Sequence, residues 1–177
     1  MFYDSRLRLR QQWRLLVPVT MLAVVLSLYT TVVLHASDGD LDPTFGDAGK
    51  VTIDFLYDGN ISTSDEAHAV AIQPDGKIVT AGAAPLNILI ALPVGRTNPD
   101  GSPDRTFGRR GQVVSDWIRY QQASSVVIQP DGRIVIGGSG GGWPDNFLLV
   151  RYNSDGSLDT SFGDNGLVQT GWGDDPN

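Results

Sequence analysis

The chain has 177 residues, no cysteine and a formal net charge of −7, and this length allows one domain of ordinary size. Without cysteine the protein has no disulfide bond, no thiolate metal ligand and no lipid-modified cysteine anchor. The acidic charge repels nucleic-acid phosphates, so nucleic acid is not an expected partner.

The N-terminal end has the pattern of an export signal. An uncharged, mostly apolar run covers residues 15–34 and follows Arg6, Arg8, Arg10 and Arg14. Residues 1–36 are therefore predicted to be a cleaved signal peptide or an uncleaved membrane anchor built on one hydrophobic helix. Both alternatives place residues 37–177 outside the cytoplasm: periplasmic, secreted, or held at the membrane only through residues 15–34.

Two phrases of the remaining sequence occur twice. Residues 69–79 return as residues 125–135, a step of 56, and residues 96–108 return as residues 151–163, a step of 55. Two different phrases that recur with nearly the same period indicate a repeated structural unit.

Short β-rich runs separated by turn signals make up each unit. In the first unit these runs are residues 50–55, 69–73, 77–81 and 86–92, and in the second they are 112–118, 125–129, 133–137 and 147–152. Pro74-Asp75-Gly76 and its counterpart at Pro130 are hairpin signals, because Pro fixes the first turn position and Gly accepts a positive φ. The predicted fold class is all-β, with repeated four-stranded antiparallel units that form a partial β-propeller.

These phrases resemble the bacterial delta-60 repeat over about residues 38–170, and Leu41-Asp42-Pro43-Thr44-Phe45-Gly46 belongs to the same pattern. The resemblance implies an exported, propeller-like repeat protein with no established catalytic residues. Thr97 departs from the pattern, since Tyr152 stands at its counterpart. Pro93 also interrupts a predicted strand, which favours an edge strand or a bulge there.

The number of units does not close a propeller. The Phe-Gly phrase occurs at Phe45, Phe107 and Phe162, whereas the Gln-Pro-Asp-Gly phrase occurs twice, which gives two full units and an extra C-terminal strand in residues 37–177. Three alternatives stay open: a truncated product or fragment, a ring of several copies joined through open sheet edges, or a small sandwich of two sheets.

Oxygen-bearing side chains surround two glycine turns, the arrangement that Ca²⁺ prefers. The candidate ligands are Asn98, Asp100, Asp104, Asn153, Asp155 and Asp159. Because no Glu closes a complete calcium loop, the favoured interpretation is a turn stabilised by its own Asn and Asp side chains. Calcium is the one cofactor that the sequence suggests.

Other candidate chemistry is weaker. Residues 137–141 satisfy G-x-S-x-G around Ser139, but no helix is predicted after them, so a flexible glycine loop is favoured. His68 lies beside Asp65 and Glu66 at a predicted strand entrance that is expected to be solvated. The recurring Phe residues are predicted to be packing anchors, and no catalytic residue is predicted.

The expected function is an exported, non-enzymatic module with a structural or binding role at the cell surface or in the periplasm. The expected partner is an unknown protein or glycan, and the loops at residues 57–66 and 139–146, which differ most between units, are the expected contact surface. The alternatives are a calcium-dependent propeller hydrolase and a truncated remnant of a larger repeat protein.

Overall fold

The computed structural model of the chain describes residues 39–57, 60–61, 64–86, 89–115, 121–141 and 146–171. The chain divides into a unit of residues Met1–Asp38 and a unit of residues Gly39–Asn177, and all described residues belong to the second unit. The predicted leader and the apolar run at residues 15–34 therefore lie outside the described part. Within that part, no helix is long and apolar enough to cross a membrane.

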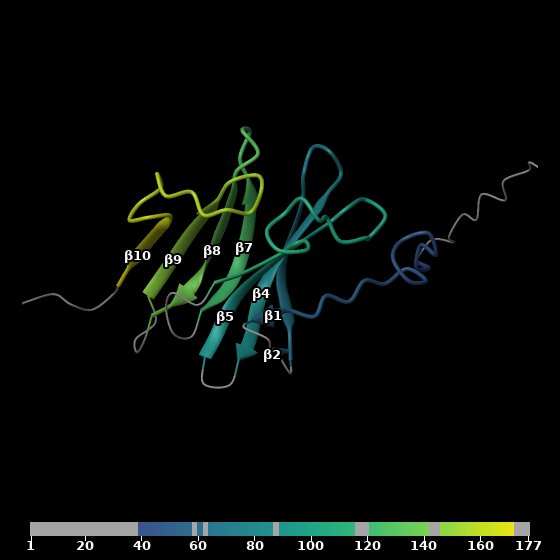
Figure 1. Cartoon of the computed structure of the whole chain (residues 1–177), viewed down its shortest axis with the longest axis horizontal. Coiled ribbons are helices and arrows are strands. Elements are labelled where there is room, and N and C mark those ends of the chain that lie inside the picture. Colours follow the sequence, from purple (N-terminus) through teal and green to yellow (C-terminus); the bar gives the residue numbers. More distant parts are fainter. Residues whose placement is uncertain are drawn as a thin grey trace, which may run out of the picture. The chain divides into compact units, whose positions relative to one another are not determined.

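Antiparallel β-structure accounts for all regular elements of the described residues (Figure 1). A small hairpin pairs β1 (Leu56–Tyr57) with β2 (Asn60–Ile61). The first sheet has the order β3 (Glu66–Ile72), β4 (Ile78–Leu86), β5 (Leu89–Thr97), β6 (Gln112–Ser115). The second has the order β7 (Gln122–Ile128), β8 (Ile134–Gly140), β9 (Asn146–Tyr152), β10 (Leu167–Thr170). The predicted all-β fold of four-stranded antiparallel units is confirmed.

The first hairpin of each sheet is formed by the repeated turn phrase. Gly76 has a φ of 82° and donates its N–H to the carbonyl of Gln73 at 2.9 Å. Gly132 has a φ of 83° and donates to Gln129 at the same distance. A glycine at this position accepts the left-handed conformation that a side chain resists, so both hairpins close in the predicted way.

The strands are grouped differently from the prediction. Residues 51–55 form no strand, although their alternating pattern predicts one. Gln112–Ser115, expected to open the second unit, instead pairs with β5 from Leu92↔Ser115 to Gly95↔Gln112 and completes the first sheet. In the same way β10 is no extra strand, because it pairs with β9 as the fourth strand of the second sheet.

Pro93 lies in a central strand whose register with β4 is the same before and after it, so the prediction of an edge strand or a bulge was wrong. β5 has β4 on one side and β6 on the other, and the register with β4 passes from Ala81↔Val94 to Ala84↔Ala91. Pro93 therefore occupies a gap in the ladder with β4, where its missing N–H is not required, and lies opposite Val114 of β6.

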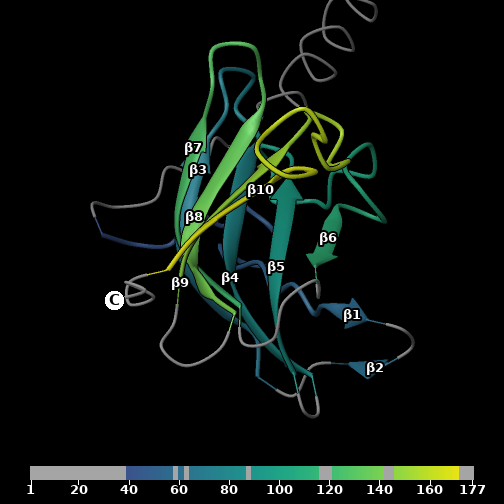
Figure 2. The same ribbon diagram turned by 90° about the vertical axis from the view of Figure 1, so that its left-hand side faces the viewer.

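One hydrophobic core lies between the two sheets, where β7 packs against β3 and β4 (Figure 2). The first sheet and the corner after it contribute Val79, Ala81, Leu92, Val94 and Phe107, and the second sheet contributes Ala123, Ile134, Ile136, Leu148, Val150 and Tyr152.

Opposite faces of the two sheets meet at this core. Val79 and Ala81 of β4 are buried, but their counterparts one repeat later are Val135 and Gly137, whereas the second sheet buries Ile134 and Ile136. Neighbouring residues of a strand point to opposite faces. The face of the first sheet that carries Val79 and Ala81, which we call the back, therefore contacts the opposite face, the front, of the second sheet. This head-to-tail stacking is the relation of successive propeller blades, and a sandwich in which equivalent faces meet would require the same residues from both sheets.

Candidate functional site

A buried corner follows the third strand of the first sheet. Arg96 at the end of β5 donates from Nε to Asp104 Oδ2 at 2.7 Å, and its guanidinium stacks 4.5 Å from the ring centroid of Phe107. The side chains of Arg96 and Asp104 are each only 5% exposed, and Phe107 is fully buried. The Arg-Asp pair and the stacked ring together fix the chain where it leaves β5.

The second sheet repeats this corner. Arg151 Nε donates to Asp159 Oδ2 at 2.7 Å, and the guanidinium stacks 4.5 Å from the Phe162 ring centroid. Phe107 and Phe162 therefore have the same arginine contact, which confirms that the matching phrases mark equivalent positions. Phe107 is a packing anchor of the core, whereas Phe162 is only half-buried and lies outside the core cluster. The difference is exposure, since the Arg151 side chain is 19% exposed.

Two Phe-Gly corners bind the turn that follows the third strand of the next sheet, at residues 98–101 and 153–156. Gly108 donates its backbone N–H to the carbonyl of Asp155 at 2.7 Å, and Gly46 donates to the carbonyl of Asp100 at 2.8 Å. Arg96 adds a second bond across the boundary, from Nη1 to the carbonyl of Ser154 at 2.6 Å. We call this set of bonds between a Phe-Gly corner and the following turn the inter-unit latch.

The latch is electrostatically stable at neutral pH. Burial by itself raises the pKa of Asp104, but hydrogen bonds from Thr106 and the charge and hydrogen bond of Arg96 outweigh it, and the pKa falls to about 2. Burial raises the pKa of Tyr152 to about 12, against a smaller lowering effect of the bond to Ser115. Asp104 is therefore ionised and Tyr152 protonated at neutral pH, as their contacts require.

The predicted calcium ligands lie in these same turns. Asp100 Oδ1 accepts from the backbone N–H and the hydroxyl of Ser102 at 2.9 and 2.6 Å, and Asp155 Oδ1 accepts in the same way from Ser157 at 2.8 and 2.6 Å. Asn98 and Asn153 donate to those same hydroxyls at 2.9 and 3.0 Å.

The other two predicted ligands, Asp104 and Asp159, bind Arg96 and Arg151 rather than facing the turn. No group of three His, Cys, Asp or Glu residues that could hold a metal ion exists in the part of the chain that the structure describes. The geometry supports the interpretation as turns, and calcium at these positions stays a prediction.

The glycine tract forms a strand rather than a loop. Ser139 lies in β8, opposite Gln122 of β7 and Phe147 of β9, so no strand-to-helix turn presents its hydroxyl. The prediction of a flexible loop was wrong for residues 137–140. The glycines are needed because β8 approaches the backbone of β7 closely: a Cβ on Gly138 would lie 2.0 Å from the carbonyl oxygen of Gln122. In the predicted contact loop at residues 139–146, residues 142–145 lie outside the described part. Trp117, Trp143 and Trp172 also lie outside it.

His68 connects the two sheets. Its Nδ1 lies 2.9 Å from the carbonyl of Ala123 in β7, and its Nε2 lies 3.1 Å from Glu66 Oε2. Hydrogen bonds to Glu66 and then to Ala123 raise its pKa. The residue therefore joins β3 and β7, the first strands of the two sheets, in addition to lying at a solvated strand entrance.

The arginines of the two corners are site residues that our sequence analysis missed. A signal exists, because Arg96 and Arg151 each stand eight positions before the Asp that they bind, in both copies of the phrase. An open groove of about 480 Å³ lies beside this latch, with Lys77, Arg96, Asp75 and Asp155 among its lining residues. Its charges are mixed, so it favours neither an anion nor a cation.

Comparison with known proteins agrees with the fold. A family model described as a domain of unknown function (DUF5122) beta-propeller matches residues 129–162. No curated protein and no solved structure gave a match. The matched residues run from the turn of the second sheet's first hairpin to Phe162, so they contain β8, β9 and the Arg151 corner. The match supports a β-propeller repeat family.

Proposed function

We propose that the chain is an exported, non-enzymatic β-propeller repeat module of the delta-60 type, with a structural or binding role at the cell surface or in the periplasm. The observation that carries this proposal is the use of the repeated charged residues. Arg96 and Asp104, like Arg151 and Asp159, bind one another within the corners, and Arg96 also binds the neighbouring sheet. An enzyme should instead hold non-repeated acidic or histidine residues that converge on one cavity.

Export is tested by cell fractionation of a bacterium that expresses the full chain. Protease added to intact spheroplasts should degrade residues 37–177. A variant with Leu22→Arg and Val25→Arg, which places two charges in the apolar run, should stay protected in the cytoplasm. Equal protection of both chains would contradict export.

The non-enzymatic role is tested with ester, phosphate and glycoside substrates, with and without millimolar calcium. We expect no turnover above a heat-unfolded control. Turnover that is lost in Ser139→Ala or His68→Ala would establish a hydrolase and refute the proposal. A protein or glycan partner is then sought by direct binding of the purified chain to a glycan array and to purified envelope proteins.

A further inference from the structure

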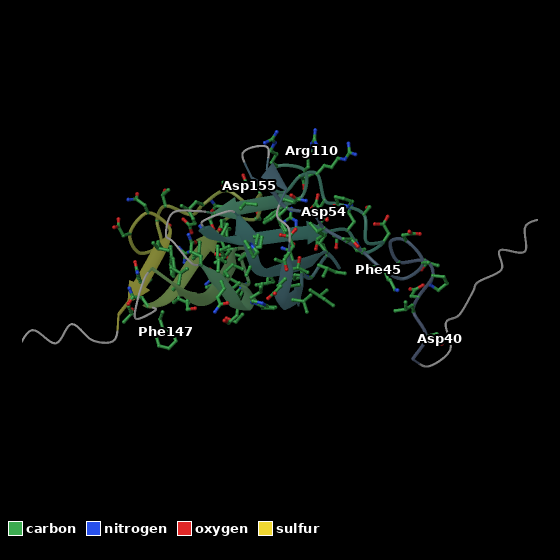
Figure 3. All side chains as sticks on the ribbon, turned by 90° about the horizontal axis from the view of Figure 1, so that it is seen from below. Asp40, Phe45, Asp54, Arg110, Phe147 and Asp155 are labelled. Carbon is green, nitrogen blue, oxygen red and sulfur yellow. The ribbon has the colours of Figure 1, made fainter. Side chains whose placement is uncertain are left out.

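The exposed large hydrophobic residues of the two sheets occur on two outward faces. Val70 and Ile72 of β3 are 66% and 70% exposed, and Val127, Phe147 and Leu149 of the second sheet are 57%, 62% and 41% exposed. Phe147 points away from the ribbon, far from Phe45 (Figure 3). Such apolar surface on a small module indicates an interaction site.

The internal repeat shows what covers the face of the second sheet. Leu149 is the counterpart of Val94, because Arg96 and Arg151 share one place in the repeat and these residues precede them by two. Val94 is fully buried in the core beneath the second sheet, whereas Leu149 is 41% exposed. The back of the second sheet thus presents to solvent the surface that the first sheet buries against its successor.

Polar groups on this face lack the partners that their counterparts have. Arg96 Nη1 binds the Ser154 carbonyl and Gln73 Oε1, at 2.6 and 3.3 Å. Gln129, the counterpart of Gln73, has a buried Oε1 without a hydrogen-bond partner among the described residues. In the same part of the chain, Gly163 N–H has no acceptor corresponding to those of Gly46 and Gly108. Among the described residues, the Gly163 N–H therefore lacks the turn that its counterparts bind, and Gln129 Oε1 lacks the hydrogen bond that Gln73 accepts from its own corner arginine.

The face of the first sheet presents the complementary surface. Val126 and Ile128 of β7 pack against the core between the sheets, and their counterparts in β3 are the exposed Val70 and Ile72. The first sheet also carries the turn at residues 98–101, the counterpart of the turn at 153–156 that the Gly108 corner binds. A second copy of this chain therefore offers both the apolar strand and the turn that the open face fits.

We propose that two copies of the chain associate head to tail, with the second sheet of one copy docked through Leu149, Arg151 and Gly163 on β3 and the 98–101 turn of the next. The contact is heterologous, so it generates rings or filaments rather than a symmetric dimer. It uses sheet faces, not the open sheet edges that the sequence suggests.

A segment of the chain already occupies part of this site. Gly46 binds the Asp100 carbonyl of its own 98–101 turn, and residues 41–51 share with residues 158–168 the pattern L-D-x-x-F-G-D-x-G-x-V. The Phe45-Gly46 corner is thus a built-in cap that competes with the Phe162-Gly163 corner of an incoming copy. Association requires displacement of this cap, and weakening the cap strengthens association.

Site-directed crosslinking tests the contact, because the natural chain has no cysteine. Val70→Cys and Leu149→Cys are made separately in the full chain, kept in a non-ionic detergent, and treated with a short bismaleimide. Both positions are exposed, so both variants should fold, which circular dichroism checks. A heterologous contact gives crosslinked dimers in the mixture of the two variants and only background in either variant alone. Equal crosslinking of the single variants, or none in the mixture, overturns the proposal and assigns the face to association through the leader or to a different partner.

The cap is tested by two chemically identical substitutions. Phe45→Ala weakens the cap and should raise the crosslink yield of the mixture several-fold, whereas Phe162→Ala weakens the incoming corner and should lower it several-fold. Arg151→Met should also lower the yield. Changes of the same sign for Phe45→Ala and Phe162→Ala would refute the competition. Failure of these experiments leaves export and the absence of catalysis unaffected, since neither depends on assembly.

Discussion

Replacement of the two corner arginines, Arg96 and Arg151, by methionine should have unequal effects on stability. Arg96→Met removes the partner of Asp104, which is 5% exposed, and leaves the carbonyl of Ser154 and Gln73 Oε1 without their donor. Breaking a buried ion pair on one side costs about 3–5 kcal/mol. Lys77, whose Nζ lies 3.5 Å from Asp104 Oδ2, offsets a part of this cost, so we expect about 3 kcal/mol.

Arg151→Met is the matched control within the same chain. Arg151 is 19% exposed, and Asp159 keeps Arg133, whose Nε lies 3.1 Å from Oδ2. The loss is that of a partly exposed pair and one cation–π contact, about 1 kcal/mol in total. The two variants should therefore differ by about 2 kcal/mol, roughly a 30-fold difference in the unfolding equilibrium.

The assay is urea unfolding of the full chain followed by far-ultraviolet circular dichroism at neutral pH and low protein concentration. Arg96→Lys should recover only a part of the loss, because an ammonium group cannot bind Asp104, Gln73 and Ser154 in the planar geometry of a guanidinium. Equal losses for Arg96→Met and Arg151→Met would refute the claim that burial across the unit boundary makes the first corner the stronger one.

Four further outcomes are expected. Since the pKa of Asp104 falls from 3.8 to about 2, its contribution is complete above pH 3.8 and is lost as the pH falls towards 2; this corresponds to about 2 kcal/mol, and Asp104→Asn should remove that part of the acid dependence of unfolding. The raised pKa of His68 stabilises the fold below pH 6.5, and this contribution is lost as the pH rises through the folded-state pKa, so urea midpoints of the natural chain and of Glu66→Gln should converge at alkaline pH. Gly108→Ala should destabilise the fold by more than about 2 kcal/mol, because a Cβ would lie 2.3 Å from the Gln112 carbonyl oxygen, whereas Gly39→Ala, also at positive φ but with nothing within 4 Å, should cost about 1 kcal/mol in the same denaturation assay. Millimolar calcium should not change the thermal midpoint relative to a chelator, because the carboxylates of Asp100 and Asp155 are used by their own turns; a clear rise would establish the calcium site.

Local chemistry explains which parts of the fold the sequence predicts. The hairpins around Gly76 and Gly132 follow from Pro and Gly at fixed turn positions, and the equivalence of Phe107 and Phe162 follows from matching phrases. Each of these features depends on residues close together in the chain, so a reading of short phrases is sufficient.

The grouping of strands depends on information that a periodic sequence lacks. A repeat has no intrinsic starting point, so Gln112–Ser115 can equally open one unit or close the preceding one. The hydrogen bonds to β5 decide for the second. Residues 51–55 occupy the same place in the repeat as that strand. Among the described residues no equivalent of β5 precedes them, and they form no strand.

Contacts to backbone atoms were also beyond the reach of the sequence. The contact between His68 and the carbonyl of Ala123 cannot be predicted from the residue type at position 123, since every residue has a carbonyl. Gly82 and Gly138 stand 56 positions apart and approach the backbone of the preceding strand, where a Cβ would lie 1.7 Å from the Glu66 oxygen and 2.0 Å from the Gln122 oxygen. The glycine tract therefore serves close strand packing beside the repeated bulge, although its composition suggests a loop.

The structure explains why the Phe-Gly phrase occurs once more than the Gln-Pro-Asp-Gly phrase. The chain supplies Phe-Gly corners at Phe45, Phe107 and Phe162 for turns at residues 98–101 and 153–156, and the first two corners occupy both turns. The spare corner lies on the open back of the second sheet, beside Arg151 and the Gln129 oxygen that has no hydrogen-bond partner among the described residues. One end of the stacked sheets is thus capped and the other is not. A copy that adds at the open end brings its own first sheet, so the Phe162-Gly163 corner must displace a corner of nearly the same sequence from the 98–101 turn of that copy.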